Sequence, residues 1–275
     1  MKKQAEYIKR IEIRGLWGRK NIIWNLRPDV NILSGVNGIG KSTILNDSVR
    51  SLKALEGKPL TNGAGGPIVT FTFAPEEATE IPFDVIRSFD RPLLNTALLE
   101  KIGNQQVRTE LDCQLYQLQR RYLDYQVNIG NRIIELLTGG DVAQQAEASK
   151  VSLPKTRFQD LVDELFSETG KKLIRKQNEI LFEQDGDTLT PYQLSSGEKQ
   201  MLVILLTALV EDNRHCALFM DEPEISLHVE WQQRLITLIR ELNPNAQIIL
   251  TTHSPAVIMN GWMDAVTEVS DITIN

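Results

Sequence analysis

A glycine-rich segment that closes on a lysine and two hydroxyl residues is the strongest chemical signal in this chain. Residues 35–42 fit the phosphate-binding pattern G-x-x-x-x-G-K-[ST]. Glycines bring backbone N–H groups close to phosphate oxygens, and the positive end of a following helix faces the same anion. Lys41 would reach the β- and γ-phosphates, and the Ser42 hydroxyl would join the coordination of Mg²⁺. The predicted nucleotide contacts are Gly35, Val36, Asn37, Gly38, Ile39, Gly40, Lys41, Ser42 and Thr43.

Two adjacent carboxylates supply the acids that such a site needs. The short apolar run 217–220 ends in Asp221 and Glu222. Two charges at the end of a buried strand are costly without a cation, so Asp221 is predicted to hold Mg²⁺. Glu222 would point to the other side of the strand and polarise the attacking water as general base.

A histidine follows a second buried strand. Residues 246–250 are apolar apart from Gln247 and lead into Thr-Thr-His-Ser-Pro. The carboxyl ends of parallel strands line the ligand crevice of an open sheet. His253 is therefore predicted beside the Asp221 strand, where it would donate a hydrogen bond to the γ-phosphate.

The elements that must position these residues predict an α/β fold. A buried strand over 29–35 precedes the phosphate loop, and an amphipathic helix over 41–55 follows it. Residues 5–35 are interpreted as alternating strands that precede the phosphate loop. Trp17 and Trp24 in this stretch are interpreted as packing residues in preference to adenine-stacking ones.

A helical insertion is predicted over 92–168, within a single domain that spans 1–275. One long helix carries apolar residues at alternating three- and four-residue steps, namely Leu111, Leu115, Leu118, Tyr122, Tyr125, Ile129, Ile133 and Leu136. A second amphipathic helix turns inward Phe158, Leu161, Val162, Leu165 and Phe166. A hairpin with Asp185-Gly186 at its turn then leads to the segment 194–210.

The segment 194–210 is a second helix start suited to an anion. Ser195, Ser196 and Gly197 precede a strongly apolar helix. A chain that already has one phosphate loop has no obvious need for another.

These four motifs together resemble those of the ABC-type ATPases. "GVNGIGKST" resembles the Walker A loop, "LSSGE" the signature motif, "LFMDEPE" the Walker B strand with its catalytic glutamate, and "TTHS" the switch histidine. In that family the signature of one subunit completes the phosphate site of the other. The resemblance implies that residues 5–35 belong to an N-terminal antiparallel β-lobe beside a mixed central sheet. It also implies catalytic roles for Glu222 and His253, the cofactors ATP and Mg²⁺, and a homodimer that sandwiches two nucleotides. The residues it places against the partner's ATP are Ser195, Ser196, Gly197 and Glu198.

Two further segments indicate which branch of the ABC-type family the chain resembles. "LSSGEKQ" is similar to the SMC, RecF and OLD-like branch, and "DEPEISLHVEWQQRLI" resembles the OLD-like and AAA15/AAA21-type ATPases of bacterial antiphage systems, including Septu- and retron-associated ATPases. His228 stands where many ABC proteins carry the D-loop aspartate, so the usual cross-dimer contact is not expected there. No clear Q-loop is found, and Gln105 and Gln106 are candidates by distance alone.

The composition bears on which partners the chain binds and where in the cell it is located. The formal net charge of −6 gives no global attraction to nucleic acid or anionic lipid. Lys171, Lys172, Arg175 and Lys176 form a local basic cluster, interpreted as a solvated face in preference to a nucleic-acid contact. Cys113 and Cys216 are interpreted as reduced packing residues, and neither a signal peptide nor a membrane span is expected, which indicates a cytoplasmic protein.

The leading hypothesis is an ATP-dependent dimeric switch that controls a separately encoded effector, a nuclease or toxin in antiphage defence. No HNH-like constellation is present and the chain leaves no room for a fused Toprim nuclease, so the destructive chemistry is expected in another polypeptide. One alternative is a RecF- or SMC-like DNA-repair ATPase that clamps DNA. Another is a transporter ATPase subunit, which "LSSGEKQ" and the missing Q-loop disfavour.

Overall fold

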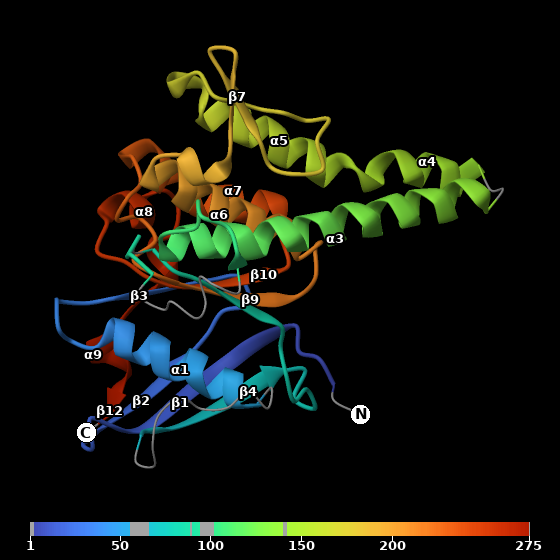
Figure 1. Ribbon diagram of the computed structural model, residues 1–275. Coiled ribbons are helices and arrows are strands. Elements are labelled where there is room, and N and C mark those ends of the chain that lie inside the picture. The colour runs from blue at the N-terminus through green and yellow to red at the C-terminus, as the bar shows by residue number, and fades with distance from the viewer. Residues whose placement is uncertain (1–2, 56–65, 89, 94–101, 140–141, 275) are drawn as a thin grey trace. The chain divides into compact units, whose positions relative to one another are not determined.

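The chain folds into two compact units in the computed structural model, which describes residues 3–55, 66–88, 90–93, 102–139 and 142–274 (Figure 1). The first unit comprises residues 1–88, 213–237 and 244–275, and the second comprises 89–212 and 238–243. Helix α7 (Val229–Leu242) contributes residues to both.

A parallel sheet forms the centre of the first unit, in the strand order β11-β3-β10-β9-β5. The inner strands β3 (Val30–Ser34), β9 (Cys216–Asp221) and β10 (Ala246–Thr251) are almost entirely buried, which explains their mostly apolar sequences. The outer strands are β5 (Phe83–Ile86) and β11 (Val266–Glu268). The register places Thr251 opposite Asp221, so both strands end at one level.

An antiparallel sheet forms the other layer of this unit, in the order β12-β2-β1-β4. Its strands are β1 (Tyr7–Leu16), β2 (Lys20–Asn25), β4 (Ile68–Ala74) and β12 (Thr273–Ile274). Apolar residues of β1 and β2 share one buried core with helix α1 (Lys41–Leu55) and with Ala217 and Phe219 of the parallel sheet. The short helices are α8 (Pro255–Met259), η3 (Met263–Ala265) and α9 (Val269–Ile272).

Helices dominate the second unit. Its long elements are α3 (Glu110–Thr138), α4 (Val142–Val151), α5 (Leu153–Leu165) and α6 (Ser196–Val210). A small sheet of β6 (Lys172–Leu173), β7 (Phe182–Gln184) and β8 (Asp187–Leu189) accompanies the 3₁₀ turns η1 (Ser167–Thr169) and η2 (Pro191–Gln193). The predicted turn lies between β7 and β8, with Asp185 and Gly186 both at positive φ.

The predicted apolar stripe on α3 faces the interior of the second unit. Leu111, Leu115 and Ile129 are buried, whereas Ile133 and Leu136 near the C-terminal end are half-buried. Helix α3 packs against α4 and α6 (Figure 1). Because α6 is apolar on all sides, it needs neighbours around its circumference.

The predicted α/β fold with an antiparallel N-terminal lobe is confirmed, and the described strands of the central sheet all pair in parallel. The extent of the helical insertion, 92–168, stays a prediction. Among the described residues, no helix has the length and apolar character needed to cross a membrane.

Candidate active site

The phosphate-loop sequence lies between a buried strand and a helix, where the pattern predicts it. It follows β3, and α1 begins at Lys41, with the Ile44 amide donating to the Gly40 carbonyl. Gly38 and Gly40 have φ of 80° and 113°, backbone conformations that side chains with a Cβ rarely adopt. The shape of this loop therefore favours glycine at position 40, which belongs to the pattern, and also at position 38, where the pattern allows any residue.

Trp17 lies directly against this loop. A Cβ built on Gly40 would stand 2.4 Å from Cη2 of the Trp17 ring, which is closer than atoms can approach. The side chain of Trp17 is 46% exposed, whereas Trp24 is 1% exposed and belongs to the core. The packing interpretation therefore describes Trp24, while Trp17 covers the loop with one edge and faces solvent with the rest.

Lys41 joins the loop to the predicted switch histidine. Its side chain is buried, and Nζ donates to the Gly35 carbonyl at 3.0 Å and contacts Nε2 of His253. A lysine ammonium has only donors, so Nε2 must accept here and the histidine proton must sit on Nδ1. The same Nε2 lies 3.4 Å from Oε1 of Glu222. Three side chains predicted from separate motifs thus converge on one point.

Asp221 sits beside the Ser42 hydroxyl. Ser42 Oγ donates to Asp221 Oδ1 at 2.9 Å, and Thr251 Oγ1 donates to the same oxygen at 2.6 Å. A hydroxyl and a carboxylate this close fit Mg²⁺, which prefers oxygen ligands and takes most of them from phosphates and water. Within the described ranges, no group of three or more His, Cys, Asp or Glu side chains suited to a metal occurs.

Glu222 occupies a sharp turn at the end of β9. Its φ of 48° is unusual for a residue other than glycine, and Pro223 follows it. The Glu222 amide donates to the backbone carbonyl of Thr251 and to its Oγ1, each at 3.1 Å. Thr251 therefore holds the carboxylate of Asp221 and the backbone of Glu222 at the strand end, a role that sequence reasoning missed because it depends on strand register.

The signature sequence forms a capped helix start in the second unit. Ser195 is the N-cap of α6, and its N–H and Oγ each donate to Oε2 of Glu198 at 2.9 Å. Oε1 of Glu198 accepts from Thr169 Oγ1 at 2.8 Å and from Lys171 Nζ at 3.0 Å. Burial alone would raise the pKa of Glu198, but these hydrogen bonds outweigh it and hold the pKa below its usual value.

The remaining signature residues are more accessible. Ser195 and Ser196 are exposed and Gly197 is half-buried, while Ser196 Oγ donates to Asp90 Oδ2 at 3.2 Å. Glu198 faces inward and supports the helix start, and its predicted contact with a partner's ATP stays a prediction. The backbone and hydroxyls of the neighbouring residues are better placed for such a contact.

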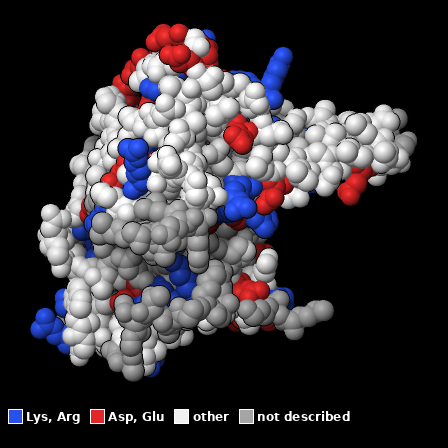
Figure 2. All heavy atoms as spheres, viewed as in Figure 1, with Lys and Arg blue, Asp and Glu red and all other residues white. Residues whose placement is uncertain are grey.

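The predicted basic cluster is partly neutralised within its own unit. Lys171 pairs with Glu198, and Arg175 pairs with Asp160 at 2.7 Å and with Asp163. On the face shown in Figure 2, the described basic side chains are scattered among acidic and uncharged residues. This arrangement supports the interpretation of a solvated face.

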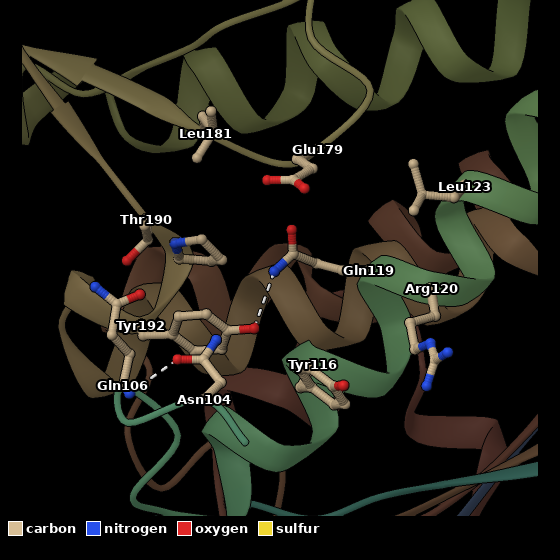
Figure 3. A pocket seen from close by; sticks show the side chains of 11 residues that line it. Asn104, Gln106, Tyr116, Gln119, Arg120, Leu123, Glu179, Leu181, Thr190 and Tyr192 are labelled. Atoms are coloured by element: carbon tan, nitrogen blue, oxygen red, sulfur yellow. Dashed lines mark hydrogen bonds between the residues drawn. The ribbon is translucent and has the colours of Figure 1, made fainter. Parts of the chain in front are cut away.

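An open cavity of about 240 Å³ lies in the second unit, between α3 and the turn η2 (Figure 3). Gln119 Nε2 donates to the Tyr192 hydroxyl at 3.1 Å across it, and burial raises the pKa of Tyr192. Gln106, one of the two Q-loop candidates, lines this cavity, and both candidates are exposed. Neither belongs to the unit that holds the phosphate loop.

A phosphate loop, an acid-ended strand and a switch histidine on one parallel sheet define a P-loop ATPase of the ABC type. Residues 83–260 match the family model described as "AAA domain, putative AbiEii toxin, Type IV TA system", and the chain belongs to this family. The resemblance to SMC-, RecF- and OLD-like ATPases of antiphage systems is thereby confirmed.

Similar proteins agree with this assignment. The chain is 23% identical to the Septu protein PtuA of Bacillus thuringiensis, over 91% of this chain and 72% of that protein. It is 30% identical to the Retron Vc95 probable ATPase of Vibrio cholerae serotype O1 biovar El Tor, over 27% of this chain and 17% of that protein. The fold resembles a crystal structure of an Smc head bound to the C-winged helix domain of ScpA, with a TM-score of 0.50, 15% identity, and coverage of 92% of this chain and 91% of that one.

Proposed function

We propose that this chain binds and hydrolyses Mg-ATP, forms a nucleotide-sandwich homodimer and thereby regulates a separately encoded effector, a nuclease or toxin in antiphage defence. The observation that carries the ATPase proposal is the convergence of Lys41, Glu222 and His253, with Ser42 and Asp221 hydrogen-bonded beside them. These residues come from three segments far apart in sequence, and they meet at the ends of adjacent parallel strands.

Each side chain has a role that its surroundings support. The loop amides of residues 35–43 and the Lys41 ammonium would bind the phosphates, and Ser42 and Asp221 would hold Mg²⁺, which supplies positive charge at the transferred phosphoryl group. Glu222 would accept the proton of the attacking water. A phosphate at Lys41 competes with His253 Nε2 for the ammonium, so binding would release the ring to interact with the γ-phosphate.

The dimer proposal rests on the signature helix. The exposed Ser196 hydroxyl and the start of α6 form a donor-rich surface, and the Ser195–Glu198 hydrogen bonds fix its shape. The phosphate loop and the signature belong to different units of the chain. A second copy would bring its own signature to this chain's nucleotide, with twofold symmetry making both sites equivalent.

The defence proposal rests on the relatives. PtuA is named for the Septu system and aligns over most of both chains. The retron-associated ATPases align over only 17% and 18% of their own lengths, so they support the proposal over a short stretch alone. A DNA clamp is less well supported, since Lys171 and Arg175 are already paired with acids.

Substitution of Lys41 by Ala tests the phosphate-loop assignment. The change removes the cation that faces the β- and γ-phosphates, so Mg-ATP affinity measured by calorimetry should fall by about a hundredfold or more. Lys9→Ala is the matched control, because Lys9 is an exposed lysine of the same unit whose partner, Glu76, is also exposed. Equal affinity in wild type and Lys41→Ala would refute the assignment.

A further inference from the structure

Glu224 is a buried carboxylate that the proposed chemistry does not use. Its side chain is 7% exposed, and it lies three residues beyond Asp221. Oε1 accepts hydrogen bonds from Thr252 Oγ1 and from the His253 amide, the latter at 3.1 Å. Oε2 is buried and has no hydrogen-bond partner among the described residues. An acid in such surroundings costs stability, so its bonds must serve a purpose beyond packing.

Gln232 holds the same loop from a neighbouring position on α7. Its Oε1 accepts from Ser254 Oγ at 2.6 Å, and its Nε2 donates to the carbonyls of Glu224 at 3.3 Å and of Leu227 at 2.9 Å. Glu224 thus bonds Thr252 and His253, and Gln232 bonds Ser254, the next residue of the loop. Gln232 also fixes the backbone of Glu224.

The loop that these hydrogen bonds hold, residues 252–254, is short. Thr251 ends β10 opposite Asp221, and Pro255 begins α8. Inside the loop, Thr252 Oγ1 accepts from the Ser254 amide at 2.9 Å. The His253 side chain itself is 37% exposed, and within the part of the chain that the structure describes its ring makes polar contacts with Lys41 and Glu222 alone. The position of the ring therefore follows from the backbone that Glu224 holds.

We propose that Glu224 is a positioning residue that fixes the loop Thr252–Ser254, with Gln232, and so places the His253 ring against Lys41 and Glu222. The inference rests on the proposed ATPase function, because it assigns His253 a place beside the γ-phosphate. Glu224 acts through hydrogen bonds that its oxygen accepts, and it does not exchange a proton with substrate.

Two substitutions at Glu224 separate positioning from chemistry. Glu224→Ala removes the acceptor, and the loop should shift; a misplacement of about 1 Å costs about a hundredfold in turnover. Affinity for Mg-ADP should stay near that of wild type, because Lys41, Ser42 and Asp221 are intact. Glu224→Gln keeps an oxygen that accepts both bonds, so it should restore most of the turnover.

Glu222→Gln is the matched control for these variants. It makes the same chemical change two positions earlier, and it should be nearly inactive because an amide cannot accept the proton of water. If Glu224→Gln were as inactive as Glu222→Gln, the acid itself would take part in the reaction and the positioning proposal would be wrong. Wild-type turnover in Glu224→Ala would also overturn it.

Histidine NMR provides a readout that does not depend on nucleotide. The chain has three histidines, His215, His228 and His253, so the ring signals can be assigned with a His253→Ala variant. Glu224→Ala should move the ring nitrogen signals of His253 and leave the other two in place, whereas Glu224→Gln should resemble wild type. Unmoved His253 signals in Glu224→Ala would overturn the proposal.

The proposed ATPase function and the positioning role of Glu224 can be refuted separately. If wild type neither bound nor hydrolysed ATP, the proposed function would fail, and the NMR comparison alone would decide whether Glu224 positions His253. If Glu224→Ala did not fold, Thr252→Val would replace it, since valine keeps the shape and loses only the hydroxyl. The proposal expects Thr252→Val to shift the His253 signals and lower turnover, and a variant unchanged in both would contradict it.

Discussion

Single contacts at the phosphate loop determine which side chains it tolerates. An added Cβ would meet the Trp17 ring at Gly40, but it would meet no atom within 4 Å at Gly38, although both glycines have positive φ. Alanine at Gly38 therefore adds backbone strain alone, of about 1–3 kcal/mol. Alanine at Gly40 adds strain and a clash with an aromatic ring.

We predict that Gly40→Ala lowers the free energy of unfolding by more than Gly38→Ala does. In a Trp17→Ala background the clash is absent, so the cost of Gly40→Ala should fall by about 1 kcal/mol, a typical coupling energy for residues in contact. Urea denaturation of the four combinations measures this coupling. An identical cost of Gly40→Ala in both backgrounds would show that Trp17 does not cover the loop.

The site residues visible in the sequence are those that belong to contiguous motifs. Lys41, Ser42 and Asp221 could be predicted because spacing within a short segment defines the phosphate loop and the acid-ended strand. Thr251 and Glu224 could not, because their roles arise from strand register and from contacts between segments about 28 residues apart. Such pairings follow from the folded sheet and leave no periodic signal.

Among the elements of the second unit, the start of α6 carries a buried carboxylate, Glu198, that accepts four hydrogen bonds. The pattern Ser195-x-x-Glu198 is a capping box, and the structure forms both of its reciprocal hydrogen bonds. The sequence therefore held a signal that Glu198 faces its own helix. The contact with a partner's nucleotide that the resemblance implies for Glu198 stays a prediction.

We predict that the stabilising effect of Glu198 depends on pH. The folded-state pKa lies below the usual value near 4.5, so the carboxylate stabilises the fold at neutral pH, and this contribution is lost as pH falls through the folded-state pKa. Glu198→Gln should cost about 2 kcal/mol at pH 7, because it breaks the charged bond to Lys171. The difference from wild type should shrink progressively below pH 4.5.

Chemical denaturation of both proteins across this pH range provides the measurement. Lys150→Ala serves as the control, since Lys150 pairs with Glu147 at an exposed position and should change stability little at any pH. A cost of Glu198→Gln that stayed constant from pH 7 to pH 3.5 would contradict the ionised, hydrogen-bonded state assigned to Glu198.

At the scale of the whole molecule, the sequence predicts the fold class and the order of the motifs well. The buried strands and the helix at 41–55 follow from apolar patterns, and the structure places them within a residue or two of the expected bounds. The division into units is less visible, because α6 joins the helices of the second unit through packing against α3 and α5. A single apolar helix gives no sign of which neighbours will cover it.

We predict that two copies of the chain hold ATP between them. Glu222→Gln should lower the hydrolysis rate by about 10²- to 10⁴-fold while Lys41, Ser42 and Asp221 still bind nucleotide. ATP should then accumulate in the sandwich. Ser196→Arg places a bulky cation on the exposed surface at the start of α6, so adding it to Glu222→Gln should prevent association and serves as the matched control.

Light scattering of Glu222→Gln with and without Mg-ATP tests this claim most directly. The mass of Glu222→Gln should be that of one chain without nucleotide and of two chains with Mg-ATP. It should return to that of one chain when Ser196→Arg is added. A mass that is unchanged by Mg-ATP, in a sample where calorimetry shows ATP bound, would contradict the nucleotide-sandwich dimer.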